Sequence, residues 1–320
     1  MSLVVRSSLA TLICSVSLMT HAAEPERCNT VRFADVGWTD IVVTTAVTRH
    51  IVNELGYRTK VSRLSVPDTY QSMANDSVDV FLGNWMPSME NDLRPYADKG
   101  QVVSLGTNLE GAKYTLAVNR AAYEAGIKSF SDLAAAQGKF AGKVYGVEPG
   151  NDGNKLIQQM IAENAFNLGS FTLVESNEAN MLAQAKRISH LNQWVAFLGW
   201  EPHPMNTDLQ MHYLDGGDQF FGPNYGGATV HTNASASFTQ QCKNITQLLK
   251  NLRFSLDMEN RLMSAILDSN TNPRREAIKW VKANPSIVAS WLNGVKHRNG
   301  QPAAQALGLL ESAKEQTASL

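Results

Sequence analysis

The sequence contains none of the short motifs that mark the common catalytic and nucleotide-binding sites. There is no Gly-x-Ser-x-Gly nucleophile elbow, no His-Glu-x-x-His pair, no Gly-x-Gly-x-x-Gly fingerprint and no phosphate-binding P-loop. The seven histidines show no metal-ligand spacing. We therefore expect neither catalysis nor a bound metal or cofactor.

An excess of charge of either sign is also missing. Lys and Arg number 28 against 29 Asp and Glu, which gives a net charge of −1, and the basic residues form no run. This distribution argues against nucleic acid or a membrane surface as a partner. With 43% hydrophobic and 18% charged residues, the 320-residue chain has an ordinary globular composition and is long enough for two medium domains or one large one.

Long apolar runs are scarce, and the clearest one lies near the N-terminus. Residues 9–19 follow the single charge of Arg6, are too few to span a bilayer, and precede the small residues Ala22 and Ala23. This pattern predicts a secretory signal peptide over residues 1–23, with an ordinary buried first helix as the alternative. The mature protein is therefore expected to be exported to the periplasm.

Cysteine is rare, and cleavage of the signal peptide would make it rarer. The chain has three cysteines, and Cys14 would leave with the signal, so that Cys28 and Cys242 remain. Two cysteines in an exported protein are expected to form a disulfide. In the loop-entropy model, a bridge over more than 200 residues stabilises the fold by about 5 kcal/mol.

Apart from these absences, short apolar runs alternate with helical patterns through most of the chain. This alternation predicts βαβ units and mainly parallel sheets flanked by helices. A helix over 41–55 is expected to take Thr39 or Asp40 as its N-cap. Two such sets with two connections indicate two lobes, the first formed by 24–112 and 221–320 and the second by 113–220. Strands are predicted at 31–34, 60–64, 78–82, 113–119, 144–147, 193–198, 211–214 and 228–231.

Three of the predicted strands are followed by glycine and tryptophan. The stretches are VGW ending at Trp38, FLGNW ending at Trp85 and FLGW ending at Trp200, and a further strand leads to Pro-Gly-Asn151. Ligands of open α/β sheets bind beyond the carboxyl ends of the strands, so we expect these tryptophans in loops that face a ligand. Trp194, Trp280 and Trp291 are instead expected to pack in the protein interior.

Several indole rings together suit a cation that cannot be held by hydrogen bonds. A quaternary ammonium ion is attracted to the face of each ring by ~0.5–2 kcal/mol. A sugar would also stack on such rings but would need many polar partners. The carboxylate of Asp40, two residues after Trp38, would compensate the positive charge in a site shielded from water.

The stretches FADVGWTDI, VDVFLGNWMPSME, GAKYTLAVN, YGVEPGNDGN, FLGWEPHPMN and FGPNYGGATVHTN carry a resemblance to a known family. They are similar to the periplasmic choline-binding proteins of bacterial ABC transporters, which belong to the type II ("Venus flytrap") substrate-binding proteins of the glycine betaine/choline class. The resemblance covers essentially the whole mature chain. It implies the two-lobed periplasmic-binding-protein-like type II α/β fold, with two interlobe connections.

The resemblance also implies the site and the partners. The ligand-binding residues would be an aromatic box of Trp38, Trp85, Tyr114 and Trp200, with Asp40 beside the ammonium and hydroxyl groups and Asn151 as a helper amide. Tyr114 is implied by the resemblance alone. The disulfide of the family matches Cys28 and Cys242. The protein would be a monomer that binds choline, closes its lobes and delivers the ligand to an ABC permease with its ATPase subunit.

Other ligands on the same fold remain open alternatives. Glycine betaine and carnitine carry a carboxylate that Asp40 would repel, and the one cation next to a motif residue, Lys113, is expected to point away from Tyr114. Acetylcholine lacks a hydroxyl donor and should bind more weakly than choline. An exported choline-ester hydrolase is a remote alternative, because the nucleophile elbow is absent.

Overall fold

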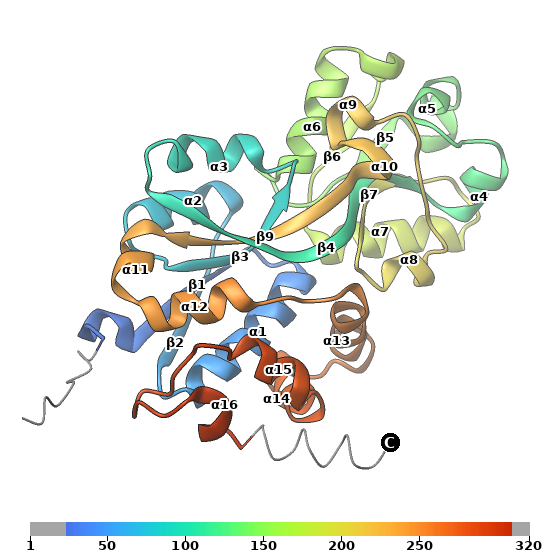
Figure 1. Ribbon diagram of the computed structural model, residues 1–320. Helices are drawn as coiled ribbons and strands as arrows, with labels where there is room; N and C mark the ends of the chain where they lie inside the picture. Colours follow the sequence, from blue (N-terminus) through green and yellow to red (C-terminus); the bar gives the residue numbers. More distant parts are fainter. Residues whose placement is uncertain (1–23, 309–320) are drawn as a thin grey trace, which may run out of the picture.

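Two groups of helices and strands, joined by two long strands, make up the computed structural model (Figure 1). The structure describes residues 24–308, so the expected signal peptide lies outside the described residues. We call the group that contains both ends of the described chain lobe I, and the other group lobe II. This arrangement confirms the two-lobed α/β class with two interlobe connections.

Lobe I combines an N-terminal set of elements with a C-terminal set of helices. Helices α13 and α14 from the second set pack against α1, whose side chains Val43, Val47 and Ile51 are buried at helical spacing. The first set comprises η1 (Glu26–Asn29), β1 (Thr30–Asp35), α1 (Thr39–Glu54), β2 (Arg58–Arg63), α2 (Val66–Ala74), β3 (Val80–Met86) and α3 (Glu90–Ala97). The second comprises α11 (Ala236–Gln241), α12 (Lys243–Asn251), α13 (Leu256–Ser269), α14 (Pro273–Ala283), α15 (Pro285–Trp291) and α16 (Ala303–Ala306).

Lobe II is continuous in sequence between the two long strands. Its first part comprises α4 (Arg120–Glu124), α5 (Phe130–Ala135), η2 (Gln137–Phe140), β5 (Lys143–Tyr145), α6 (Asp152–Ala162), η3 (Ala165–Asn167) and β6 (Thr172–Val174). Its second part comprises α7 (Glu178–His190), β7 (Ala196–Glu201), α8 (Met205–Asp208), β8 (His212–Tyr213), α9 (Asp218–Phe221) and α10 (Pro223–Gly226).

The two connections are β4 (Val102–Val118) and β9 (Gly227–Ser235), which run antiparallel to each other. They place all the strands in one continuous curled sheet of order β2-β1-β3-β9-β4-β7-β5-β6, with β8 paired to β4. The expected parallel pairs lie at its two ends, where β1 pairs with β2 and β3, and β5 pairs with β6 and β7. The antiparallel pairs are those made by the crossing strands.

A disulfide joins Cys28 to Cys242, as expected, and both cysteines are fully buried. It ties η1, at the start of the described chain, to the residue between α11 and α12. The bridge therefore fastens the C-terminal helices of lobe I to its N-terminal set. Of the other tryptophans expected in the interior, Trp291 is buried and stacks on Trp280 with ring centroids 5.6 Å apart.

Two of the three Gly-Trp stretches lie inside strands, so their assignment to loops was wrong. Strand β3 continues through Trp85 to Met86, and β7 continues through Trp200 to Glu201. The glycines serve close packing rather than turns: a Cβ on Gly83 would lie 2.6 Å from the Ile41 side chain, and one on Gly199 would lie 2.6 Å from that of Met211. Only the stretch that ends at Trp38 lies in a loop.

The expected N-cap of α1 was also wrong. The helix begins at Thr39, and Trp38 occupies the N-cap position without a side-chain hydrogen bond to the helix. The carboxylate of Glu178, at the start of α7 in lobe II, accepts the backbone N–H of Thr39 at 2.9 Å and its hydroxyl hydrogen as well. An acid from the other lobe thus satisfies the free end of the helix.

Candidate functional site

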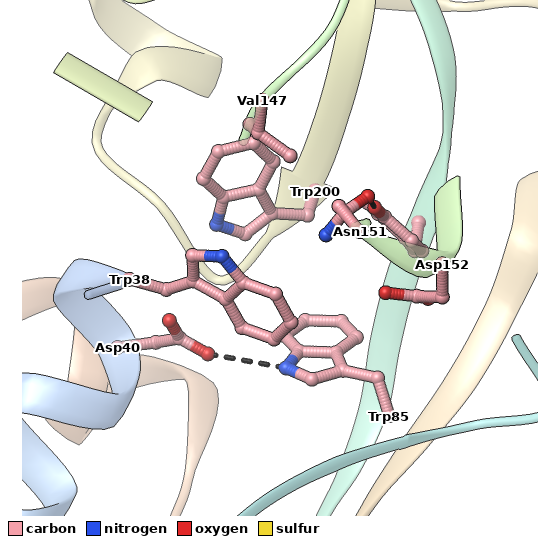
Figure 2. Close-up of a pocket in the computed structure, with 8 residues that line it drawn as sticks. Trp38, Asp40, Trp85, Val147, Asn151, Asp152 and Trp200 are labelled. Carbon is pink, nitrogen blue, oxygen red and sulfur yellow. Dashed lines mark hydrogen bonds between the residues drawn. The ribbon is translucent and has the colours of Figure 1, made fainter. Parts of the chain in front are cut away.

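A small pocket lies between the lobes, where α1, β3, β4, β7 and the start of α6 meet. The structure brings every expected ligand-binding residue to this one pocket (Figure 2). The lining residues are Trp38, Asp40, Trp85, Tyr114, Val147, Asn151, Asp152 and Trp200. Val147 and Asp152 were not predicted.

The aromatic walls come from both lobes. Trp38 precedes α1 and Trp85 lies in β3, both in lobe I. Tyr114 in β4 stands directly opposite Trp200 in β7, so the antiparallel register places both rings on the same face of the sheet. The ring centroids of Trp85 and Tyr114 are 5.8 Å apart. The four rings are between 3% and 8% exposed, so they present a largely dry apolar surface.

Asp40 places a carboxylate among these rings. Its side chain is 1% exposed, and Oδ2 accepts a hydrogen bond from the Trp85 indole at 3.2 Å (Figure 2). Within residues 24–308, Oδ1 has no hydrogen-bond partner. Burial raises the pKa of Asp40 to about 8, and the negative charge of Glu178 adds to the rise. A cation placed beside Oδ1 would restore the ordinary preference for the ionised form.

Asn151 is held with its amide oriented. It is the N-cap of α6, and its Oδ1 accepts the backbone N–H of Asn154 at 3.1 Å and the hydroxyl of Tyr114 at 2.9 Å. The carbonyl oxygen is therefore fully used within the protein. The NH₂ group, whose Nδ2 lies 3.5 Å from Oε1 of Glu148, is the part of Asn151 left for a ligand.

Three further contacts join the lobes around the pocket. The Trp38 indole donates to Oε1 of Glu148 at 2.9 Å, so lobe II fixes the orientation of a lobe I ring. The Thr39–Glu178 contact lies beside it, and Nζ of Lys155 in α6 lies 2.5 Å from Oδ1 of Asp92 in α3. These pairs can form only while the lobes are close together. Neither glutamate was predicted, because pairing across lobes leaves no local sequence signal.

None of the described residues that line the pocket has a basic side chain. Lys113, the nearest cation in sequence to a lining residue, pairs instead with Glu201 at 2.8 Å. Across the described part of the chain, no three His, Cys, Asp or Glu side chains are grouped in a way that could hold a metal ion. The site therefore offers ring faces, carboxyl oxygens and one amide donor group.

Comparison with known proteins shows the family. The substrate-binding domain of ABC-type glycine betaine transport systems matches residues 29–283. The chain belongs to this family. Within residues 24–308 of this binding protein, no helix has both the length and the apolar character needed to cross a bilayer.

Solved structures and curated relatives agree with this assignment. A structure described as an ABC-transporter choline binding protein in complex with choline shares 52% identity and a TM-score of 0.87, over 89% of this chain and 99% of the other. A second structure, described as an ABC-transporter choline binding protein in an unliganded semi-closed conformation, shares 52% identity and a TM-score of 0.82. The match covers 88% of this chain and 98% of the other. The glycine betaine/carnitine transport binding protein GbuC of Listeria monocytogenes serotype 1/2a is 24% identical over 49% of this chain and 51% of its own.

Proposed function

We propose that this binding protein captures choline and delivers it to the permease and ATPase of an ABC importer. The observation that carries this proposal is a cage of four aromatic rings around a buried carboxylate, one of whose oxygens has no partner among residues 24–308. In this cage Trp38, Trp85, Tyr114 and Trp200 would face the ammonium group. The proteins at 52% identity, described as choline binding, support the choice of ligand.

The attraction of the rings is large enough for useful affinity. At ~0.5–2 kcal/mol per ring, the four rings would supply roughly 2–8 kcal/mol. The charge of Asp40 would add to this, because the pocket is dry and its residues are already in place. The upper end of the range for the rings corresponds to a Kd of about 1 μM, before the charge of Asp40 is added and the cost of association is subtracted.

A zwitterion fits the pocket less well. The carboxylate of glycine betaine or carnitine needs a cation or several N–H donors, and none of the described residues that line the pocket has a basic side chain. Asp40 would also repel that carboxylate. These two compounds remain the second candidates, because the family to which the chain belongs is described by glycine betaine transport.

Closure of the lobes would be the signal to the transporter. Each lobe supplies part of the cage, so only the closed form surrounds the ligand, and ligand binding would favour that form. The contacts made by Glu148, Glu178 and Lys155 across the cleft would stabilise it. We place the lobe limits at residues 112/113, inside β4, and 226/227, where β9 begins. The second limit lies after the expected 220/221, because α9 and α10 belong to lobe II (Figure 1).

Binding proteins of this family work outside the cytoplasm, and we propose that this one works in the periplasm after removal of residues 1–23. It would act as a monomer and would carry out no chemistry on its ligand. Incubation with acetylcholine tests the second point, because release of choline and acetate above the uncatalysed rate would support a hydrolase instead.

Calorimetric titration of the purified protein tests the choice of ligand. Choline, acetylcholine, glycine betaine and carnitine are compared at one pH and one salt concentration. Choline should saturate a single site and bind most tightly, with acetylcholine weaker because it lacks the hydroxyl donor. A tighter fit for glycine betaine or carnitine would overturn the choice of choline.

A further inference from the structure

A second buried carboxylate, Asp152, lines the pocket from lobe II. It is 2% exposed, and neither of its carboxyl oxygens has a partner in hydrogen-bonding geometry among residues 24–308. The Ser88 hydroxyl, which donates to the backbone carbonyl of Trp85, lies near enough to lower the pKa of Asp152. Figure 2 shows Asp152 and Asp40 on opposite sides of the indole rings. An unpaired buried carboxyl group costs free energy unless something that binds in the pocket satisfies it.

The position of Asp152 in its helix is informative. It is the first residue of α6, which runs for 11 residues from the pocket into lobe II. The N-terminus of a helix carries a partial positive charge and free N–H groups, and this makes it a favourable place for a ligand carboxylate. Here the protein's own carboxyl group occupies that end of the helix.

On the lobe II side of the pocket, Asp152 is the side chain that can still accept a hydrogen bond from a ligand. The carbonyl oxygen of Asn151 is used by the Tyr114 hydroxyl and the Asn154 N–H. Across the pocket, Oδ2 of Asp40 accepts from Trp85, and its Oδ1 faces the place proposed for the ammonium group. The family resemblance places the ligand hydroxyl beside Asp40. A hydroxyl tail that points instead toward lobe II would meet the carboxyl oxygens of Asp152.

We propose that Asp152 is a specificity-determining residue of this pocket. Its carboxyl group accepts a hydrogen bond from the hydroxyl group of a ligand tail. Its negative charge repels a carboxylate tail from the N-terminus of α6. The pocket is thereby selective for cationic amino alcohols over zwitterions. This inference rests on the proposed function, because it says which residue contacts the tail of a ligand whose ammonium group lies in the aromatic cage.

The charge state of Asp152 is consistent with this role. Burial raises its pKa to about 7, and the carboxylates of Asp92 and Glu148 add to the rise, while the nearby Ser88 hydroxyl opposes it. A bound cation favours the ionised form, which is the better acceptor for a hydroxyl group and the stronger repellent for a carboxylate.

The test compares three ligands that share an ammonium group and differ in the tail. Tetramethylammonium has no tail, choline has a hydroxyl tail and glycine betaine has a carboxylate tail. Affinities are measured by calorimetry for the wild type, Asp152→Asn and Asp152→Ala. Dividing each affinity by that for tetramethylammonium removes any effect that the substitution has on the cage or on lobe closure.

The two variants separate the two roles of the carboxyl group. Asp152→Ala removes the acceptor and the charge, so the choline ratio should fall about tenfold and the glycine betaine ratio should rise about tenfold. Asp152→Asn keeps an acceptor, so the choline ratio should stay within about threefold while the glycine betaine ratio still rises. Unchanged ratios in Asp152→Ala, or an unchanged glycine betaine ratio in Asp152→Asn, would overturn the proposal.

Glu163→Gln is the matched control. Glu163 is an exposed acidic residue at the opposite end of α6 and does not line the pocket. Its substitution should leave both ratios unchanged. If the wild type binds neither tetramethylammonium nor choline, the proposed function fails, whereas uniform effects of the Asp152 variants refute only this inference.

Discussion

Lowering the pH should weaken the binding of a quaternary ammonium ion through Asp40. Burial raises the pKa of this residue to about 8 in the ligand-free pocket. A cation gains from the ionised carboxylate, so a protonated Asp40 must lose its proton when the ligand binds. With such a pKa, roughly half of the Asp40 side chains are ionised at pH 8 and roughly one in a hundred at pH 6. The apparent affinity should therefore fall about fiftyfold between these two pH values.

The stability of the ligand-free protein should depend on pH in the opposite direction. The pKa of Asp40 in the folded protein lies above its usual value of 3.8, so the folded state holds the proton more tightly than the unfolded chain does. This contribution to stability is complete below about pH 4 and is lost as the pH rises to about 8. The increase in Tm produced by choline should therefore grow over the same rise in pH.

Calorimetry at pH 6, 7 and 8, in buffers of different ionisation enthalpy, measures both the affinity and the proton release. Close to one proton should leave Asp40 for each choline bound at pH 7. Asp40→Asn should weaken binding and remove most of the pH dependence, with a smaller part remaining at Asp152, whose pKa burial raises to about 7. An affinity that is constant from pH 6 to pH 8, without proton release, would refute the reasoning.

Three further predictions concern the cage, the disulfide and lobe closure. Trp38→Ala and Trp200→Ala should each weaken choline binding by more than ~1 kcal/mol in calorimetry, whereas Trp194→Phe, outside the pocket, should not change it. Unchanged affinity in either alanine variant would show that the replaced ring does not contact the ligand. Cys28→Ser breaks the bridge over 214 residues and should lower the free energy of unfolding by about 5 kcal/mol in denaturant titrations; a loss below ~1 kcal/mol contradicts the loop-entropy estimate. Thr39→Val removes the hydroxyl hydrogen bond to Glu178 without changing the charge near Asp40, and it should raise the choline dissociation rate at least about threefold in stopped-flow fluorescence. An unchanged rate would show that closure does not depend on this contact.

The two-lobed fold could be predicted because its signals are local. Apolar runs that alternate with helical patterns report each βαβ unit from within a few residues, and the chain's return through 228–231 indicated the second connection. The antiparallel course of β4 and β9 could not be read in the same way. It depends on pairing between strands more than 100 residues apart, for which the sequence has no local signal.

The site was predicted in part, and partly for the wrong reason. The tryptophans do meet in one pocket, but Trp85 and Trp200 do so from inside strands, where the preceding glycines make room for neighbouring side chains. Tyr114 was implied only by family resemblance, because its role depends on the register between β4 and β7. Asp152 was overlooked because an aspartate in the first turn of a helix is common for local reasons.

The most direct test of the account is the structure of the protein crystallised with choline. The central claim is that a cage shared by both lobes holds the ammonium group. The account predicts the choline nitrogen within ~6 Å of the ring centroids of Trp38, Trp85, Tyr114 and Trp200, beside Oδ1 of Asp40. Choline bound outside this pocket, or bound in it with the ammonium group away from the rings, would contradict the account.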